Sequence, residues 1–108
     1  MKPLLGAHVS AAGGHARAFA RASLIRADCL QIFTRAPSQW RGKPLLADEV
    51  AEFRRQRQAA GQPPVLAHDL YLTNLASDDP VVFGKSVDSL IDEVRRCYEL
   101  GLDGLVLH

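Results

Sequence analysis

The sequence predicts an α/β fold in which short strands alternate with helices and pair in parallel. Four short apolar runs have the length of buried strands, and three longer segments between them carry apolar residues at helical spacing. Glycine or proline lies at most of the boundaries, where the chain must turn. Strands that alternate with helices imply right-handed crossover connections and therefore a parallel sheet.

The expected strands are residues 3–8, 29–33, 65–67 and 105–107. Each is an apolar run too short for a helix and is flanked by loop or turn formers. Three of the four histidines, His8, His68 and His108, lie at the C-terminal ends of these runs. In parallel α/β folds that edge of the sheet carries the chemistry, so we expect functional side chains there.

The expected helices fill the segments between the strands. The first runs from about residue 15 to 24, with Phe19 and Ala22 facing inward. The second begins at Asp48 or a neighbour, and Val50 and Phe53 are spaced for one buried face. The third has Pro80 in its first turn and ends at Gly101. Its apolar residues at helical spacing are Val87, Leu90, Ile91, Val94 and Cys97.

Two architectures fit this order of elements. One is a small doubly wound sheet, and the other is the N-terminal half of a (β/α)8 TIM barrel, which typically needs ~250 residues. The chain stops at an apolar strand with no covering helix after it. Because a parallel strand is normally covered on both faces, we expect residues 1–108 to be one partial TIM-barrel domain, interrupted at the end of its fourth strand.

Composition excludes several classes of protein. With 47% hydrophobic and 23% charged residues, the chain is globular, and 13 basic against 12 acidic residues give no overall attraction to nucleic acid or membranes. No apolar run reaches the ~18 residues that span a bilayer, and the N-terminus lacks the apolar core of a signal peptide. Cys29 and Cys97 form no C-x-x-C motif and are expected to be reduced, packed thiols. A cytoplasmic location is expected.

His68 and His108 are the sharpest candidates for chemistry. Parallel strands would place both imidazoles on one edge, near enough to share a metal. Two ligands are too few for a catalytic zinc, which usually takes three from the protein. The alternative is a pair of hydrogen-bonded histidines without metal. His8 either joins the site or lines a pocket beside it, and His15 needs no special role.

The loops offer weaker signals. Residues 34–46 combine Arg35, Arg41 and Lys43 with Trp40, which suits a nucleic-acid surface or a loop anchored by its tryptophan. Tyr71 and Leu72 follow His68 and fit either a wedge into stacked bases or ordinary packing. Residues 6–14 match no nucleotide-binding motif, although backbone N–H groups before a helix can bind any phosphate.

Four blocks of sequence together resemble the bacterial endonuclease IV family. They are Gly6-Ala7-His8-Val9-Ser10-Ala11-Ala12-Gly13-Gly14, Phe33-Thr34 with Gln39-Trp40-Arg41, His68-Asp69-Leu70-Tyr71-Leu72-Thr73-Asn74-Leu75, and Ile91-Asp92-Glu93 through Cys97 to Leu100-Gly101-Leu102. The blocks occur in order and span essentially the whole chain.

The resemblance implies a TIM barrel that cuts duplex DNA at abasic sites during base excision repair, using three zinc ions, and that is monomeric at full length. By resemblance, His68 and His108 match two histidines that bind one zinc. Tyr71 and Leu72 match a loop that enters the DNA at the lesion. His8 and Ser10 lie in the first DNA-facing loop, and Arg35 to Trp40 lie in the second.

The chain departs from the family in two respects. Ser38 stands where the family can carry an arginine that enters the base stack. The remaining zinc ligands follow position 108 in the family, so the 108 residues alone are expected to be inactive. Two rival functions remain open: a metal-dependent sugar isomerase or epimerase on a related barrel, and a non-catalytic DNA-binding remnant.

Overall fold

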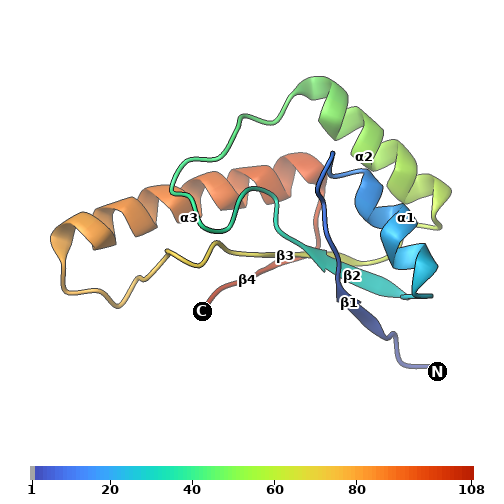
Figure 1. Cartoon of the computed structure of the whole chain (residues 1–108), viewed down its shortest axis with the longest axis horizontal. Helices are drawn as coiled ribbons and strands as arrows, with labels where there is room; N and C mark the ends of the chain where they lie inside the picture. The colour runs from blue at the N-terminus through green and yellow to red at the C-terminus, as the bar shows by residue number, and fades with distance from the viewer. Residues whose placement is uncertain (1) are drawn as a thin grey trace.

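The computed structural model describes residues 2–108 and contains four strands and three helices in strict alternation (Figure 1). The elements are β1 (Gly6–His8), α1 (Arg17–Leu24), β2 (Cys29–Ile32), α2 (Ala47–Ala59), β3 (Val65–His68), α3 (Pro80–Leu100) and β4 (Gly104–Val106). The predicted order is confirmed, and the bounds differ from the expected ones by a few residues at most. The first strand differs most from expectation: residues 3–8 were expected, but only Gly6–His8 pair with β2.

The strands form one parallel sheet in the order β1-β2-β3-β4. Gly6 pairs with Cys29, Leu30 with Val65, and Ala67 with Leu105. A doubly wound sheet reverses its strand order near the middle, whereas a barrel adds each strand beside the previous one. The unbroken order is therefore that of a partial TIM barrel.

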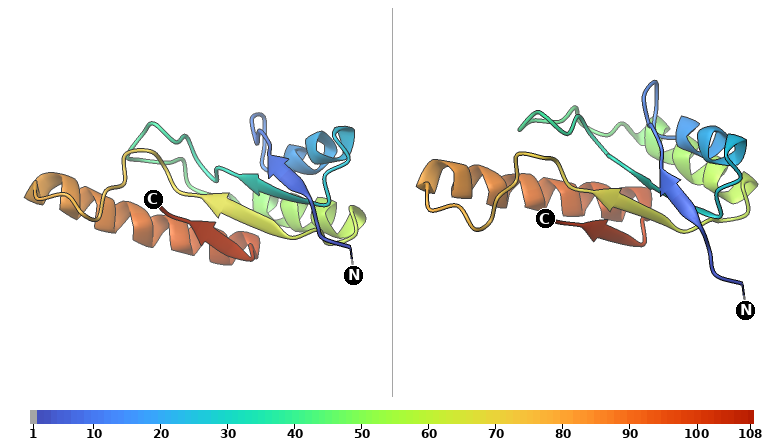
Figure 2. Two further views of the ribbon diagram at one scale, coloured as in Figure 1. Left: turned by 90° about the horizontal axis from the view of Figure 1, so that it is seen from below. Right: turned by 60° about the horizontal axis from the view of Figure 1, so that its bottom comes forward.

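The helices cover a single face of the sheet. Figure 1 shows α1, α2 and α3 gathered on one side of the strands, and α2 packs against both α1 and α3. The molecule measures 44 × 33 × 19 Å, and its thickness suits one sheet covered by one helix layer about 10 Å across. The two further views show the thin, curved layer of strands in front of α2 (Figure 2).

The core lies between this helix layer and the sheet. Phe19 of α1 and Phe53 of α2 place their ring centroids 4.9 Å apart, and both are buried as expected. Ile32 and Val65 from the central strands and Leu100 from α3 complete the cluster. Burying apolar area is the main force that holds the helices to the sheet.

Helix α3 begins and ends where its sequence indicates. The Asp79 carboxylate accepts hydrogen bonds from the backbone N–H groups of Val81 and Val82, and Pro80 follows in the first turn. Gly101 closes the helix in the left-handed conformation, at φ +72°. The long helix projects past the C-terminal ends of the strands in Figure 1, so its first half lies beside the loops at that edge.

The buried face of α3 differs from the expected one. Ile91 and Val94 are 45% and 53% exposed, and no segment within residues 2–108 covers them. Instead α3 buries a polar row: Ser89, Glu93 and Arg96 contact the 34–46 loop, and Ser86 accepts the N–H of Asn74 in the β3–α3 loop. Apolar spacing located the helix correctly, but the face that is buried depends on the loop beside it.

The structure contains no helix among residues 2–108 that is long and apolar enough to cross a membrane. Both cysteines are free thiols, and Cys97 is buried in α3. Burial raises the pKa of the Cys97 thiol to about 12, and the nearby carboxylates of Glu93 and Asp69 add to the effect.

Candidate functional site

Aromatic and imidazole rings gather at the C-terminal edge of the sheet. Phe33, just after β2, lies at the centre of the group. Its ring centroid is 4.5 Å from that of His8, 5.4 Å from that of His68 and 5.4 Å from that of Tyr71. We call His8, Phe33, His68, Tyr71 and His108 the rim cluster. The expectation that the strand-end histidines converge on one edge matches this arrangement.

His68 and His108 face each other within the rim cluster. Their Nε2 atoms lie 2.8 Å apart. The Nδ1–H of His68 donates to the backbone carbonyl of Asp69 at 2.6 Å. This second hydrogen bond fixes the ring and leaves the lone pair of a neutral His68 on Nε2, as in histidines that bind metals.

The pair fits half of a zinc site. Two imidazole nitrogens bound ~2.05 Å from a tetrahedral zinc lie roughly 3.3 Å apart, so the rings need to separate by about half an ångström. His108 is exposed and has room to move. Within residues 2–108 no group of three or more histidine, cysteine or carboxylate side chains could hold a metal ion. The described chain therefore offers two ligands and not a complete site.

A side chain of β2 holds the ring of His8. The Gln31 side-chain amide donates to Nδ1 of His8 at 2.9 Å. Burial lowers the pKa of His8, and the neighbouring His68 lowers it further. The ring therefore favours its neutral form, in which Nδ1 accepts from Gln31 and Nε2 carries the proton. Ser10, two residues on, is exposed, and its hydroxyl accepts a hydrogen bond from the N–H of Ala12.

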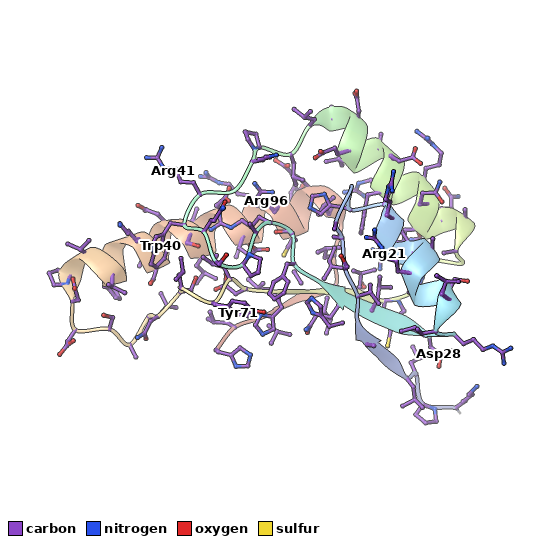
Figure 3. The ribbon with its side chains drawn as sticks, in the orientation of Figure 1. Arg21, Asp28, Trp40, Arg41, Tyr71 and Arg96 are labelled. Atoms are coloured by element: carbon purple, nitrogen blue, oxygen red, sulfur yellow. The ribbon has the colours of Figure 1, made fainter. Side chains whose placement is uncertain are left out.

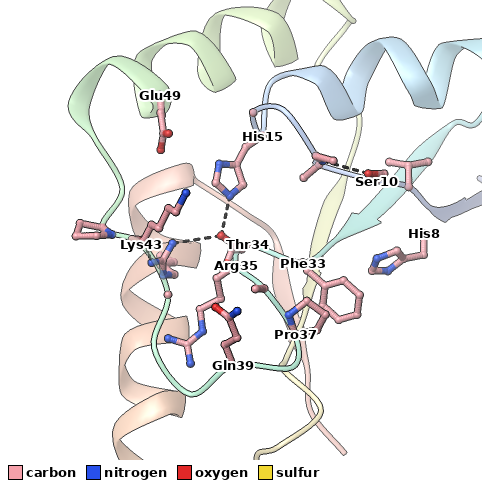
Figure 4. A pocket seen from close by; sticks show the side chains of 18 residues that line it. His8, Ser10, His15, Phe33, Thr34, Arg35, Pro37, Gln39, Lys43 and Glu49 are labelled. Atoms are coloured by element: carbon pink, nitrogen blue, oxygen red, sulfur yellow. Dashed lines mark hydrogen bonds between the residues drawn. The ribbon is translucent and has the colours of Figure 1, made fainter.

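The first two loops at this edge enclose a cavity of about 620 Å³ (Figure 4). The β1–α1 loop forms one wall, and the 34–46 loop forms the other. His15 bridges the walls, because its Nε2–H donates to the carbonyl of Thr34 at 2.6 Å. His15 therefore links the β1–α1 loop to the 34–46 loop, although its position in the sequence indicated no special role.

Arg35 lies deeper than a DNA-contacting residue would. Only 4% of its side chain is exposed. Its guanidinium donates to the carboxylate of Asp92 at 2.5 Å, to the Ser89 hydroxyl at 2.6 Å and to the carbonyl of Trp40 at 3.0 Å. A phosphate contact would require breaking these bonds, so Arg35 is placed to hold the loop to α3.

The other loop residues divide between anchoring and exposure. Trp40 is half-buried, and the Lys85 ammonium lies 5.9 Å from its ring centroid. Arg41 is exposed and points away from the ribbon (Figure 3). Tyr71 is 68% exposed, and its N–H donates to the carbonyl of Pro37 at 2.8 Å. Leu72 is half-buried beside it.

Sequence reasoning assigned no role to several residues that shape this edge, although Phe33 and Thr34 lie in a block that resembles the endonuclease IV family. Phe33 and Gln31 position the imidazoles, and Thr34 and Arg96 hold the second loop. One sequence signal was available for α3: polar residues recur at positions 86, 89, 93 and 96, a helical spacing that marks one polar face. No comparable pattern marks Phe33, whose neighbours come from three different elements.

Comparison with known proteins agrees with the fold. A family model described as xylose isomerase-like TIM barrel matches residues 19–108. The proteins named probable endonuclease 4 from Halorhodospira halophila and Geobacter sulfurreducens are 45% and 42% identical to this chain, over 98% and 100% of its length. The crystal structure of endonuclease IV from Thermus thermophilus superposes with a TM-score of 0.90 at 36% identity.

The chain spans little more than a third of these proteins. It covers 36% of the Halorhodospira halophila and Geobacter sulfurreducens relatives and 39% of the Thermus thermophilus chain, while that structure covers 95% of this one. The chain belongs to the xylose isomerase-like TIM barrel family, and over nearly its whole length it is similar to about a third of proteins named endonuclease IV.

Proposed function

We propose that this chain is the part of a zinc-dependent abasic-site endonuclease that supplies two ligands of one zinc and two DNA-facing loops. The reaction is hydrolysis of the phosphodiester 5′ to an abasic site in duplex DNA, which leaves a 3′-hydroxyl. One observation carries the proposal: His68 and His108 bring Nε2 atoms to 2.8 Å at the same edge that exposes Tyr71.

The metal side of the proposal rests on how the histidines are held. Asp69 orients His68 through its carbonyl, and Phe33 packs against the same ring. Zinc ions bound at such an edge supply a water of lowered pKa and neutralise phosphate oxygens. A complete enzyme of this kind uses three zinc ions, of which these residues supply at most one partial site. The 108 residues alone are therefore expected not to cleave DNA.

The DNA side of the proposal rests on exposure at the rim cluster. Tyr71 is exposed and adjoins Leu72, so the two side chains suit a wedge that holds a gap in the base stack. Turning an abasic sugar out of the duplex costs little where no base pair exists. His8, Ser10 and Trp40 lie on the flanking loops, where they suit backbone contacts. The wedge and the flanking loops all belong to one chain, so the proposed DNA contacts need only a monomer.

A sugar isomerase or epimerase is the second candidate. The description of the matching family names xylose isomerase, and a cavity of about 620 Å³ is large enough for a sugar. This candidate predicts turnover of a free sugar and no affinity for duplex DNA. A non-catalytic DNA-binding remnant is the third candidate, and it predicts a native product near 11.8 kDa without zinc. A barrel of ~250 residues would weigh roughly 27 kDa.

The test uses the full-length gene product isolated from its own cells. Its mass, its zinc content and its cleavage of a duplex with one abasic-site analogue are measured together. We expect zinc and cleavage in the wild type, and loss of cleavage together with a lower zinc content in His68→Ala and His108→Ala. Tyr71→Ala is the matched control, because it should weaken cleavage while zinc content stays unchanged. Zinc-free protein that binds but never cuts the abasic duplex would refute the proposal.

A further inference from the structure

A polar cluster, buried except for the half-exposed carboxylate of Asp92, ties the 34–46 loop to α3 behind the rim cluster. Its members, which we call the loop anchor, are Thr34, Arg35, Ser89, Asp92, Glu93 and Arg96. We infer that the loop anchor positions the DNA-facing loops, with Thr34 and Glu93 as its central positioning residues. This inference rests on the proposed function, because it assigns a role in DNA engagement to residues that do not touch DNA.

Thr34 connects three elements through one residue. Its hydroxyl donates to Oε1 of Glu93 at 2.5 Å, and both side chains are almost fully buried. Its carbonyl accepts from Nε2 of His15 at 2.6 Å and from Nη1 of Arg96 at 3.2 Å. The end of β2, the β1–α1 loop and α3 therefore meet at a single backbone position.

Two arginines hold the 34–46 loop against α3 by hydrogen bonds near both of its ends. Arg35 binds Asp92 and Ser89 on α3 and also the carbonyl of Trp40. Arg96 donates to the carbonyl of Lys43 and, through Nε, to Asp92 at 3.1 Å. Residues 34–46 form no helix or strand, so these bonds hold the loop in place where backbone ladders do not.

The anchor also reaches the segment that carries the wedge. The carbonyl of Pro37 accepts the N–H of Tyr71 at 2.8 Å, which links the two neighbouring loops. A shift of the 34–46 loop would therefore move Tyr71 as well. Buried polar clusters are seldom more stabilising than apolar packing of the same volume. Their directional bonds specify one geometry, and one geometry is what a DNA-binding edge requires.

Thr34→Val removes the hydroxyl donor but keeps the shape of the side chain, and Thr34→Ser restores the donor. In the full-length gene product we expect Thr34→Val to raise KM for an abasic duplex about tenfold, because misplaced binding groups weaken substrate engagement. The value of kcat should stay within about threefold, because the rim histidines keep their own supports. Zinc content should be unchanged, and Thr34→Ser should return KM to near the wild-type value.

Trypsin gives a readout that needs no activity. The bond between Arg35 and Ala36 is cut only when the Arg35 side chain leaves its buried place, whereas Arg26 lies exposed in the turn after α1. We expect the rate of cleavage after Arg35, relative to that after Arg26, to rise about tenfold in Thr34→Val and to stay near wild type in Thr34→Ser. Ser89→Ala, a milder change that removes one acceptor of Arg35, should raise the ratio less.

The two readouts separate the possible failures. An unchanged trypsin ratio in folded Thr34→Val and Ser89→Ala would overturn the anchor itself. A raised ratio with unchanged KM would overturn its role in DNA engagement. Wild-type protein that does not cleave abasic DNA would refute the proposed function, and the trypsin ratio would still decide whether the anchor holds the loop. If Thr34→Val does not fold, Ser89→Ala decides the same questions.

Discussion

Arg57 offers a sharp test of the division between a functional edge and a structural edge of this sheet. It lies at the N-terminal edge, opposite the rim cluster, and its side chain is 10% exposed. The guanidinium donates to the carbonyls of Pro63 and Gly101 at 3.0 and 2.7 Å and to the Asp103 carboxylate at 2.7 Å. The same carboxylate oxygen accepts the N–H of Val65 on β3. Arg57 thus joins the α2–β3 turn to the α3–β4 turn.

The cost of Arg57→Met follows from these bonds. A buried hydrogen bond from a charged donor contributes about 1.5–3 kcal/mol, but water can replace part of each bond here. The Asp103 side chain is 50% exposed, which reduces the ion pair to about 1 kcal/mol. Counting about 1 kcal/mol for each carbonyl as well gives a loss of about 3 kcal/mol. Methionine keeps the apolar contacts of the arginine stem, so packing changes little.

Urea denaturation of the full-length protein measures this loss. Arg55→Met is the matched control, because Arg55 lies in the same helix but is 67% exposed and pairs with Glu52 on the helix surface. The control should lose no more than about 0.5 kcal/mol. Cleavage by folded Arg57→Met should stay within about twofold of wild type, because the functional edge is untouched. A loss below about 1 kcal/mol, or a folded variant without cleavage, would refute the reasoning.

Three further predictions concern single side chains. Burial raises the pKa of Glu93, although Thr34 and two arginines oppose the shift. Protonated Glu93 therefore favours folding most below its unfolded pKa near 4.5, and this contribution is lost as pH rises through the folded pKa. As the pH rises through the folded pKa, urea denaturation should show Glu93→Gln becoming more stable relative to the wild type, because glutamine stays uncharged. A stability difference between the two proteins that does not change with pH would contradict this. Cys97, with its pKa near 12, should resist alkylation by iodoacetamide at pH 8 until urea unfolds the protein. Mass spectrometry measures the extent of labelling, and rapid labelling of the native protein would count against the burial of Cys97. Gly101→Ala should lower the melting temperature through a loss of about 1 kcal/mol or more, because φ is +72° and the new Cβ would lie 3.0 Å from the Arg54 guanidinium; an unchanged transition would disprove the strain.

Local signals were enough to predict the order of elements. Pro80 and Gly101 mark the ends of α3 because their backbone preferences act within a single turn. The short apolar runs located all four strands, since the strands of a parallel sheet are normally covered on both faces. The choice of a barrel over a doubly wound sheet rested on the uncovered last strand and on the family resemblance, and the strand order, which no local pattern encodes, confirms it.

The candidate site was predictable only in part. The strand-end positions of His68 and His108 brought them to one edge, as parallel pairing requires. Arg35 illustrates the limit, because sequence shows that a loop is basic but not which cations turn inward. Its direction depends on Asp92 and Ser89, which lie more than fifty residues away. The role of Phe33 could not be predicted for the same reason, since that role comes from neighbours on β1, β3 and the loop that follows β3.

The chemistry of the cut ends tests the central claim most directly. The full-length gene product is incubated with a duplex that contains one true abasic site, before and after chelation and with zinc restored. If hydrolysis occurs 5′ to the site, the cut end carries a 3′-hydroxyl that a polymerase can extend. Cleavage should stop on chelation and return when zinc is restored. A blocked 3′ end formed by elimination on the other side of the sugar, or no cleavage at all, would contradict the claim.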